Sequence, residues 1–177
     1  MMITRERYES GATIEQFIAG ARENQDLWRS VYARASVPEE LAQRARQLPA
    51  RHLLVLAEDW CGDAVNTVPV LARLAEAVPG LDLRILGRDA KPDLMDPHLS
   101  DGARAIPVVM VLDEAFREVG WWGSRPDPLQ AWVRTDGQAL DKGARYREIR
   151  RWYARDRGRS TLEEVIGIME QTALQAA

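Results

Sequence analysis

The stretch that decides the fold is His52-Leu-Leu-Val-Leu-Ala57, followed directly by Glu58-Asp59-Trp60-Cys61-Gly62-Asp63-Ala64. Residues 52–57 are a continuous apolar run of strand length, which is typical of a strand buried on both faces in the middle of a sheet. After Gly62, apolar residues recur at helical spacing, namely Val65, Val68, Leu71, Ala72 and Ala75. The sequence therefore predicts a buried strand, a turn that carries a lone cysteine, and a helix that begins directly after it.

Around this unit the sequence predicts an α/β arrangement. A second strand is expected at 81–86 and a short helix at 92–99, followed by strands at 107–112 and 116–122. The last two strands are separated by a few polar residues, which is typical of an antiparallel hairpin.

The two ends of the chain are predicted to be helical. Thr13-Ile-Glu-Gln16 is a capping box, a signature of a helix start. Ser160-Thr-Leu-Glu163 announces a final helix in the same way. Further helices are expected after Asp26, at 39–48, at about 127–134 and at 138–157. We expect one compact domain made of an N-terminal helical extension (1–50), an α/β core (51–135) and a C-terminal helical extension (136–177).

Composition narrows the function. The 177 residues are 46% hydrophobic and 29% charged, as in a globular protein. The net charge of −3 gives no overall basic footprint for nucleic acid. No apolar run has the roughly 18 residues of a membrane helix, and residues 1–11 lack the apolar segment of a signal peptide. We therefore expect a cytoplasmic protein with neither a nucleic-acid nor a membrane partner.

Cysteine and histidine usage argues against a metal site. The single cysteine, Cys61, excludes an internal disulfide and any multi-cysteine metal site. His52 and His98 lack metal-ligand spacing, and we expect no catalytic role for either. The sequence predicts no metal and no cofactor.

Cys61 is the candidate reactive residue. Free amides and the helix dipole at a helix amino terminus favour the thiolate over the thiol. Gly62 leaves room for a partner to approach the sulfur, and Trp60 would shelter one side of it. The alternative is an inert Cys61 that acts as a small hydrophobic residue.

These residues carry a resemblance to the thioredoxin superfamily, whose active site is Trp-Cys-Gly-X-Cys at such a strand-to-helix junction. Pro69 lies where the family's helix is kinked by a proline, and Ile106-Pro107 lies in the place of its cis-proline. Gly123 follows at the spacing of a glycine in the family's last strand. The resemblance implies a thioredoxin-like fold, with a central mixed sheet flanked by helices. It also implies that Pro107 exposes backbone groups to an extended peptide that Ile106 contacts.

Within the superfamily the chain is most similar to a bacterial group, usually called only "thioredoxin family protein", with a Trp-Cys-Gly-Asp-Ala motif. It shares two further stretches with that group, Trp122-Gly-Ser-Arg-Pro126 and residues 152–158. Two departures from ordinary thioredoxins stand out. Ala64 replaces the second cysteine, and Val55 replaces the buried carboxylate that serves as a proton shuttle.

Charges near Cys61 oppose the helix dipole. A carboxylate at ~6 Å costs the thiolate about 2–3 kcal/mol at an effective dielectric of ~20, whereas a helix end contributes only about 0.3–1 kcal/mol. Glu58, Asp59 and Asp63 would each disfavour the thiolate in this way unless the positive charge of an arginine offsets them. Arg104 and Arg88 are the candidate arginines. We expect a thiol pKa not far below that of an ordinary cysteine.

Other candidate site residues have two interpretations. Asp63 is favoured as a helix-capping acid, with tuning of the thiol or cation binding as alternatives, and Asp59 fits a local turn equally well. Arg125 is favoured as a surface arginine, although it could bind a ligand carboxylate or hold Asp63. One ring of Trp121-Trp122 is expected in the core, and we place Trp122 in a candidate groove. The arginines between 145 and 159 are expected to form a solvated helix face.

Three functions remain open. The first is a monothiol redox protein, in which Cys61 exchanges with a mixed disulfide and an external thiol resolves it. The second is a non-catalytic binding or adaptor module that uses the thioredoxin groove. The third, glutathione-assisted iron–sulfur carriage, lacks the motif that it needs at Asp63-Ala64. The expected partner is a protein or a low-molecular-weight thiol or disulfide. The sequence makes no prediction of the oligomeric state.

Overall fold

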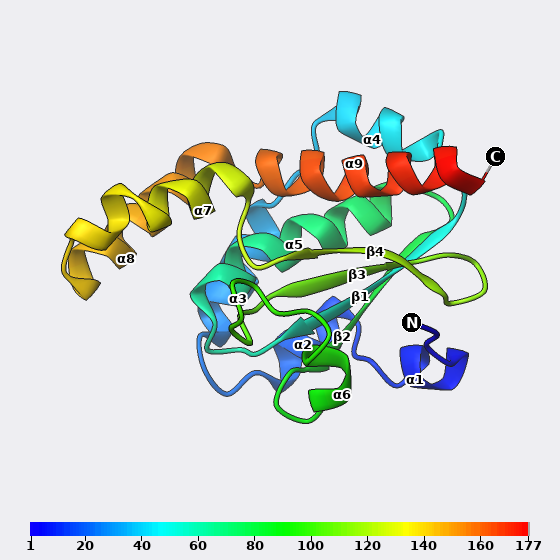
Figure 1. Cartoon of the computed structure of the whole chain (residues 1–177), viewed down its shortest axis with the longest axis horizontal. Coiled ribbons are helices and arrows are strands. Elements are labelled where there is room, and N and C mark those ends of the chain that lie inside the picture. The colour runs from blue at the N-terminus through cyan, green and yellow to red at the C-terminus, as the bar shows by residue number, and fades with distance from the viewer. Residues whose placement is uncertain (177) are drawn as a thin grey trace.

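A computed structural model describes the backbone of residues 1–176 and the side chains of residues 1–174. Its centre is a four-stranded sheet in the order β2-β1-β3-β4 (Figure 1). Strand β1 is parallel to β2 and antiparallel to β3, and β3 and β4 form an antiparallel hairpin. The strands are β1 (Arg51–Ala57), β2 (Leu81–Gly87), β3 (Val108–Leu112) and β4 (Glu118–Gly123). The predicted thioredoxin-like fold, a mixed sheet flanked by helices, is confirmed.

The central position of β1 follows from its composition. Leu53 to Ala57 are fully buried, since β2 and β3 flank the strand and helices cover both faces of the sheet. Val55 pairs with Ile85 on one side and with Val109 on the other. An apolar side chain is therefore required at every position of this strand.

The second strand of the hairpin, β4, begins two residues later than predicted. The Asp113 carboxylate accepts hydrogen bonds from the amides of Ala115 and Arg117, at 2.9 Å each. Phe116 adopts a left-handed backbone with φ of 59°. The side chain of Asp113 therefore extends the turn through Phe116, and β4 starts only at Glu118.

Helices enclose the sheet and form both extensions. They are α1 (Arg5–Glu9), α2 (Ile14–Gly20), α3 (Gln25–Arg34), α4 (Glu39–Arg46), α5 (Gly62–Ala77), α6 (Pro92–Met95), α7 (Asp127–Arg134), α8 (Lys142–Asp156) and α9 (Arg159–Ala176), with a 3₁₀ turn at Asp136–Ala139. The capping box at α2 forms as predicted, with both of its hydrogen bonds present. Helix α8 starts later than predicted, because Asp141 accepts the amide of Ala144 at 2.9 Å and caps the helix there. Helix α1 was not predicted.

Two helices define one face of the sheet. Helix α5 packs beside β2, and α9 runs alongside β4 (Figure 1). The close approach of α9 depends on Gly120, because a Cβ atom there would lie 2.7 Å from the Ile168 side chain. On the opposite face Tyr8 of α1 packs against the rings of His52 and Phe116.

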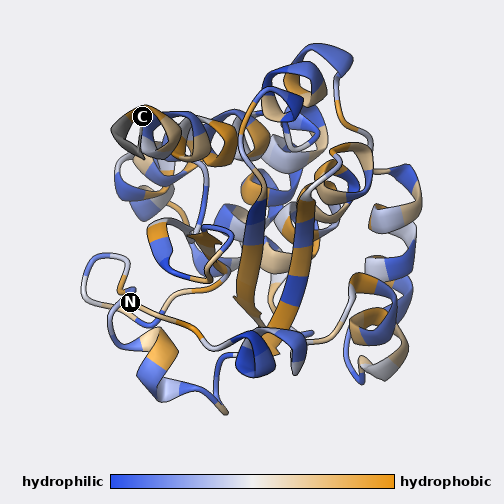
Figure 2. Ribbon diagram, turned by 90° about the vertical axis from the view of Figure 1, so that its right-hand side faces the viewer, coloured by the Kyte–Doolittle hydropathy of each residue, from blue (hydrophilic) through white to orange (hydrophobic). Residues whose placement is uncertain are grey.

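The hydrophobic core continues from the sheet into both extensions. Trp28 and Leu41 join it from the N-terminal helices, and Leu162 and Val165 join it from α9. Figure 2 shows hydrophobic residues concentrated in the central strands. Helices α7 and α8 project beyond the sheet (Figure 1) and have a small separate cluster centred on Leu129, Ile149 and Tyr153. None of the helices within residues 1–176 is both long and apolar enough to cross a membrane.

Candidate functional site

Cys61 lies at the junction of β1 and α5, as the sequence predicts. Its sulfur acts as the N-cap of α5 and accepts the amide of Ala64 at 3.5 Å. The thiol donates to the carbonyl oxygen of Ile106 at 3.4 Å, so the sulfur faces the Ile106-Pro107 segment. The Ile106–Pro107 peptide bond is cis. The structure therefore brings four predicted site residues, Cys61, Ala64, Ile106 and Pro107, into one place.

The thiol of Cys61 is almost covered, with a relative exposure of 7%. Burial raises the pKa of the Cys61 thiol above its ordinary value, and the charge of Asp63 raises it further. The Ala64 amide and Arg125 act in the opposite direction and are outweighed. Our expectation of a pKa just below the ordinary value was wrong in direction, because it balanced charges and left burial out.

Asp63 is held in the interior and does not serve as the helix cap. Arg125 Nη2 lies 2.7 Å from Asp63 Oδ2, and Tyr153 Oη donates to Asp63 Oδ1 at 3.0 Å. Asp63 is 9% exposed and Tyr153 is 4% exposed. The favoured interpretations of Asp63 as a cap and Arg125 as a plain surface residue were wrong, and the alternative in which Arg125 holds Asp63 is what the structure shows.

Arg125 sits in the loop that joins β4 to α7. Its Nη1 also donates to Gln130 Oε1 at 3.3 Å, and its buried Nε has no hydrogen-bond partner within the described residues. The Asp63 carboxylate raises the pKa of the Arg125 guanidinium although burial works against the charged form. Arg125 therefore remains a cation beside the thiol.

Sequence reasoning missed Tyr153 as a site residue. It lies within the stretch 152–158 that supported the family resemblance, and a single tyrosine in an arginine-rich helix carries no pattern that indicates a contact 90 residues away. Its burial and its hydrogen bond to Asp63 raise the pKa of the Tyr153 phenol, so the phenol remains a proton donor.

Asp59 anchors the turn before Cys61 to the N-terminal extension. Its Oδ2 accepts the amides of Arg22 at 2.7 Å and Glu23 at 3.0 Å. Its backbone carbonyl accepts Trp28 Nε1 at 2.9 Å and Asn24 Nδ2 at 3.2 Å. These backbone amides outweigh partial burial and lower the pKa of the Asp59 carboxyl. Asp59 is thus a structural anchor whose ties reach well beyond a local turn.

Trp60 is the exposed ring of the site, at 43% relative exposure. The Arg88 guanidinium lies over it, 5.1 Å from the ring centroid, and Arg88 forms an ion pair with Asp89. Arg104 pairs with Asp96 at 2.6 Å, away from the carboxylates that flank Cys61. The prediction that Arg104 or Arg88 offsets those carboxylates is therefore corrected, since Arg125 fills that role for Asp63 and backbone amides bind Glu58 and Asp59.

Trp122 is buried, so its ring is not exposed to a ligand as the predicted groove would require. It is 6% exposed, and its Nε1 donates to Glu164 Oε2 of α9 at 2.6 Å. Trp121 points to the other face and meets the ring of His98 edge-on. The end of β4 nevertheless touches the site, because a Cβ at Gly123 would lie 2.6 Å from the carbonyl oxygen of Pro107. Glycine is required there for the close approach.

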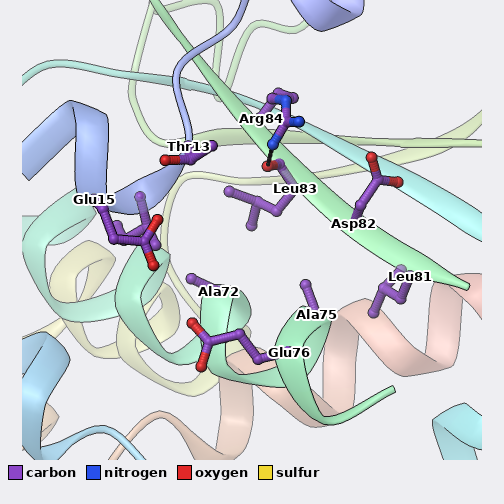
Figure 3. Close-up of a pocket in the computed structure, with 10 residues that line it drawn as sticks. Thr13, Glu15, Ala72, Ala75, Glu76, Leu81, Asp82, Leu83 and Arg84 are labelled. Atoms are coloured by element: carbon purple, nitrogen blue, oxygen red, sulfur yellow. Dashed lines mark hydrogen bonds between the residues drawn. The ribbon is translucent and has the colours of Figure 1, made fainter. Parts of the chain in front are cut away.

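Two surface hollows occur near the N-terminal helices, and Cys61 lines neither. One lies beside the turn before Cys61 and is lined by Phe17, Arg22, Glu58 and Asp59 among others. The other lies between α2, α5 and β2, and Glu15 and Glu76 face it (Figure 3). At its edge Arg84 Nη1 donates a hydrogen bond to the Leu83 carbonyl oxygen.

Neither histidine belongs to the site. His98 is buried between the Leu94 carbonyl and Glu118, and His52 pairs with Asp82. Among the residues that the structure describes, no cluster of three or more His, Cys, Asp and Glu side chains could hold a metal ion.

The fold and the site together define a thioredoxin-like α/β protein with a lone thiol at the amino terminus of its first core helix. A family model described as thioredoxin matches residues 11–143, and the chain belongs to the thioredoxin family.

Two solved structures are similar along nearly the whole chain. One is a protein of unknown function from Pseudomonas aeruginosa, with 24% identity and a TM-score of 0.75 over 97% of this chain and 100% of that one. The other is an HIV epitope-scaffold, with 22% identity and a TM-score of 0.73 over 94% of this chain and 96% of that one. These likenesses show the fold. The comparison with curated proteins gives no match.

Proposed function

We propose that this protein carries out thiol–disulfide exchange of the monothiol type at Cys61. The observation that supports the proposal is the placement of the sulfur between the Ala64 amide and the Ile106 carbonyl. The amide can stabilise a thiolate, and the segment at Ile106 and Pro107 lies directly against the sulfur. A structural cysteine in a core needs neither feature.

The chemistry takes two exchange steps. The Cys61 thiol loses its proton to solvent, and the thiolate attacks one sulfur of a partner disulfide. A new disulfide to Cys61 forms, the old one breaks, and the other half leaves as a thiolate. A low-molecular-weight thiol, as its thiolate, then attacks the mixed disulfide and releases Cys61, because Ala64 provides no resolving sulfur. The external thiol ends in a disulfide with the partner's sulfur, and resolving the mixed disulfide in this way is the step that a second cysteine performs in ordinary thioredoxins.

The raised thiol pKa predicts slow exchange at neutral pH. Only the thiolate attacks a disulfide, and the raised pKa leaves a small thiolate fraction at pH 7. A partner that docks at Trp60 and displaces water would act on a largely protonated sulfur. The proposal therefore requires that the rate rises with pH.

The direct test is mass spectrometry of the intact chain after incubation with glutathione disulfide at pH 8. We expect one glutathione adduct per chain, located at Cys61 and removed by excess thiol. Cys61→Ser is the matched control and should show none. An unmodified chain whose thiol is alkylated normally after denaturation would contradict the proposal.

A second candidate, a non-catalytic binding module, is favoured by the contrast between a covered sulfur and an exposed Trp60. In that case bound proteins would be retained by Cys61→Ser and lost with Trp60→Ala. Loss of all bound proteins with Cys61→Ser would support exchange instead.

A further inference from the structure

Three residues from separate parts of the chain meet beside Cys61. Asp63 lies in the first turn of α5, Arg125 lies in the loop after β4, and Tyr153 lies on α8 in the C-terminal extension. Their contacts measure 2.7 Å from Arg125 Nη2 to Asp63 Oδ2 and 3.0 Å from Tyr153 Oη to Asp63 Oδ1. The exchange chemistry described above uses none of them.

The position of this cluster gives its charges a direct effect on the sulfur. Asp63 is two residues from Cys61 in the turn that the sulfur caps, and its negative charge opposes a thiolate. The positive charge of Arg125 favours the thiolate and lies at hydrogen-bond distance from the carboxylate. Low exposure strengthens both effects, because water screens them poorly.

The other charged groups near the sulfur are directed elsewhere. The carboxylate of Glu58 accepts the amide of Asp89, and that of Asp59 accepts amides of the N-terminal extension. Arg88 lies over Trp60 and pairs with Asp89. Asp63 and Arg125 are therefore the charged side chains that act on the Cys61 thiol.

We propose that Asp63, Arg125 and Tyr153 form a positioning network that sets how readily Cys61 ionises. Asp63 suppresses the thiolate, Arg125 offsets that charge, and Tyr153 holds the carboxylate in place from the C-terminal extension. The proposal deepens the proposed exchange at Cys61 and rests on it for its biological meaning. Its physical content concerns the thiol alone.

The test is the pH profile of Cys61 alkylation by iodoacetamide in the intact chain and in four variants. Asp63→Asn removes the opposing charge, and we expect the thiol pKa to fall by about one unit. At pH 8 this gives about three- to fivefold faster alkylation, because a less basic thiolate is also a weaker nucleophile. Arg125→Gln should slow alkylation several-fold, and Arg125→Lys should restore most of the rate. Tyr153→Phe leaves the charges in place, and we expect a change of less than about threefold.

Opposite shifts distinguish the network from mere loosening. A variant that only opens the site would expose the sulfur and speed alkylation in every case, and that result would overturn the proposal. Equal rates in all variants would overturn it as well. Should Arg125→Gln fail to fold, as judged by its thermal melt, the Asp63→Asn and Arg125→Lys pair still decides.

Failure of the network and failure of the exchange function give different results. Alkylation needs no disulfide, so the network is tested even if Cys61 exchanges with nothing. Shifted alkylation profiles without any glutathione adduct would contradict exchange and leave the network intact. A glutathione adduct together with unshifted alkylation profiles would support exchange and contradict the network.

Discussion

Asp59 and Asp63 lie two residues before and two residues after Cys61, and different parts of the chain hold them. Asp59 is bound by backbone amides and by the Trp28 and Asn24 side chains of the N-terminal extension. Asp63 is bound by the side chains of Arg125 and Tyr153. The first carboxylate is fixed by dipoles and the second by a charge and a phenol.

The difference shows how the two sets of contacts contribute to the site. Backbone amides hold Asp59 without adding any net charge near the sulfur, so this tie serves mainly stability. The contacts of Asp63 bring a cation within range of Cys61, so this tie also affects the thiol. The N-terminal extension therefore supports the turn, whereas Arg125 of the core and Tyr153 of the C-terminal extension affect the thiol.

The largest effect is expected from Trp28→Ala. Trp28 is fully buried and joins α3 to the Asp59 carbonyl. We expect the free energy of unfolding to fall by about 3–5 kcal/mol in urea or guanidinium titrations. Its neighbour Leu27, at 45% exposure, is the control, and Leu27→Ala should cost less than about 0.5 kcal/mol. Similar losses for the two variants would refute the anchoring role of Trp28.

Asp59→Asn should cost about 1–2 kcal/mol, because two amides lose a charged acceptor. The folded-state pKa of Asp59 is lowered, so its stabilisation is present above the unfolded pKa of about 3.9 and is lost as the pH falls through the folded value. The difference in stability between Asp59→Asn and the unmodified chain should therefore shrink below about pH 4. Asp26→Asn, on a fully exposed side chain, is the control and should cost less than about 0.5 kcal/mol at neutral pH. A pH-independent difference would argue against the amide contacts of Asp59.

Tyr153→Phe should cost about 1 kcal/mol in the same unfolding experiment, through loss of one hydrogen bond to a buried carboxylate. Tyr146→Phe on the same helix, where the side chain is exposed, is the matched control and should be neutral. A loss of unfolding free energy that is as large for Tyr146→Phe as for Tyr153→Phe would contradict the hydrogen bond from Tyr153 to Asp63.

The smallest effect is expected from Arg104→Ala. Arg104 and Asp96 are both more than half exposed, and such surface pairs contribute about 0–1 kcal/mol. We expect no change in the pH profile of Cys61 alkylation. A clear shift of that profile would restore Arg104 as a group that tunes the thiol.

Much of the fold could be predicted because it depends on local patterns. The apolar run at 52–57 and the capping box at Thr13 are readable without any tertiary information. The first residues of β4 and α8 could not be predicted, since they depend on the Asp113 and Asp141 side chains accepting hydrogen bonds from particular backbone amides. Such choices depend on geometry that residue periodicity does not contain.

The site was predictable in position and less so in environment. The resemblance to thioredoxins predicted that the Ile106-Pro107 segment faces Cys61, and the structure shows that contact. The contact between Asp63 and Tyr153 spans 90 positions, and the burial that raises the thiol pKa arises only when the sheet and helices close around the sulfur. Long-range burial has no signal in a single sequence.

The most direct test of exchange at Cys61 is the rate of its reaction with an aromatic disulfide as a function of pH. Cys61 is the only cysteine, so the reaction reports on this sulfur alone. A thiol whose pKa is raised by burial predicts a rate that increases about tenfold per pH unit with no plateau below pH 9. A plateau below pH 9, or no reaction at any pH in the folded chain, would contradict this account.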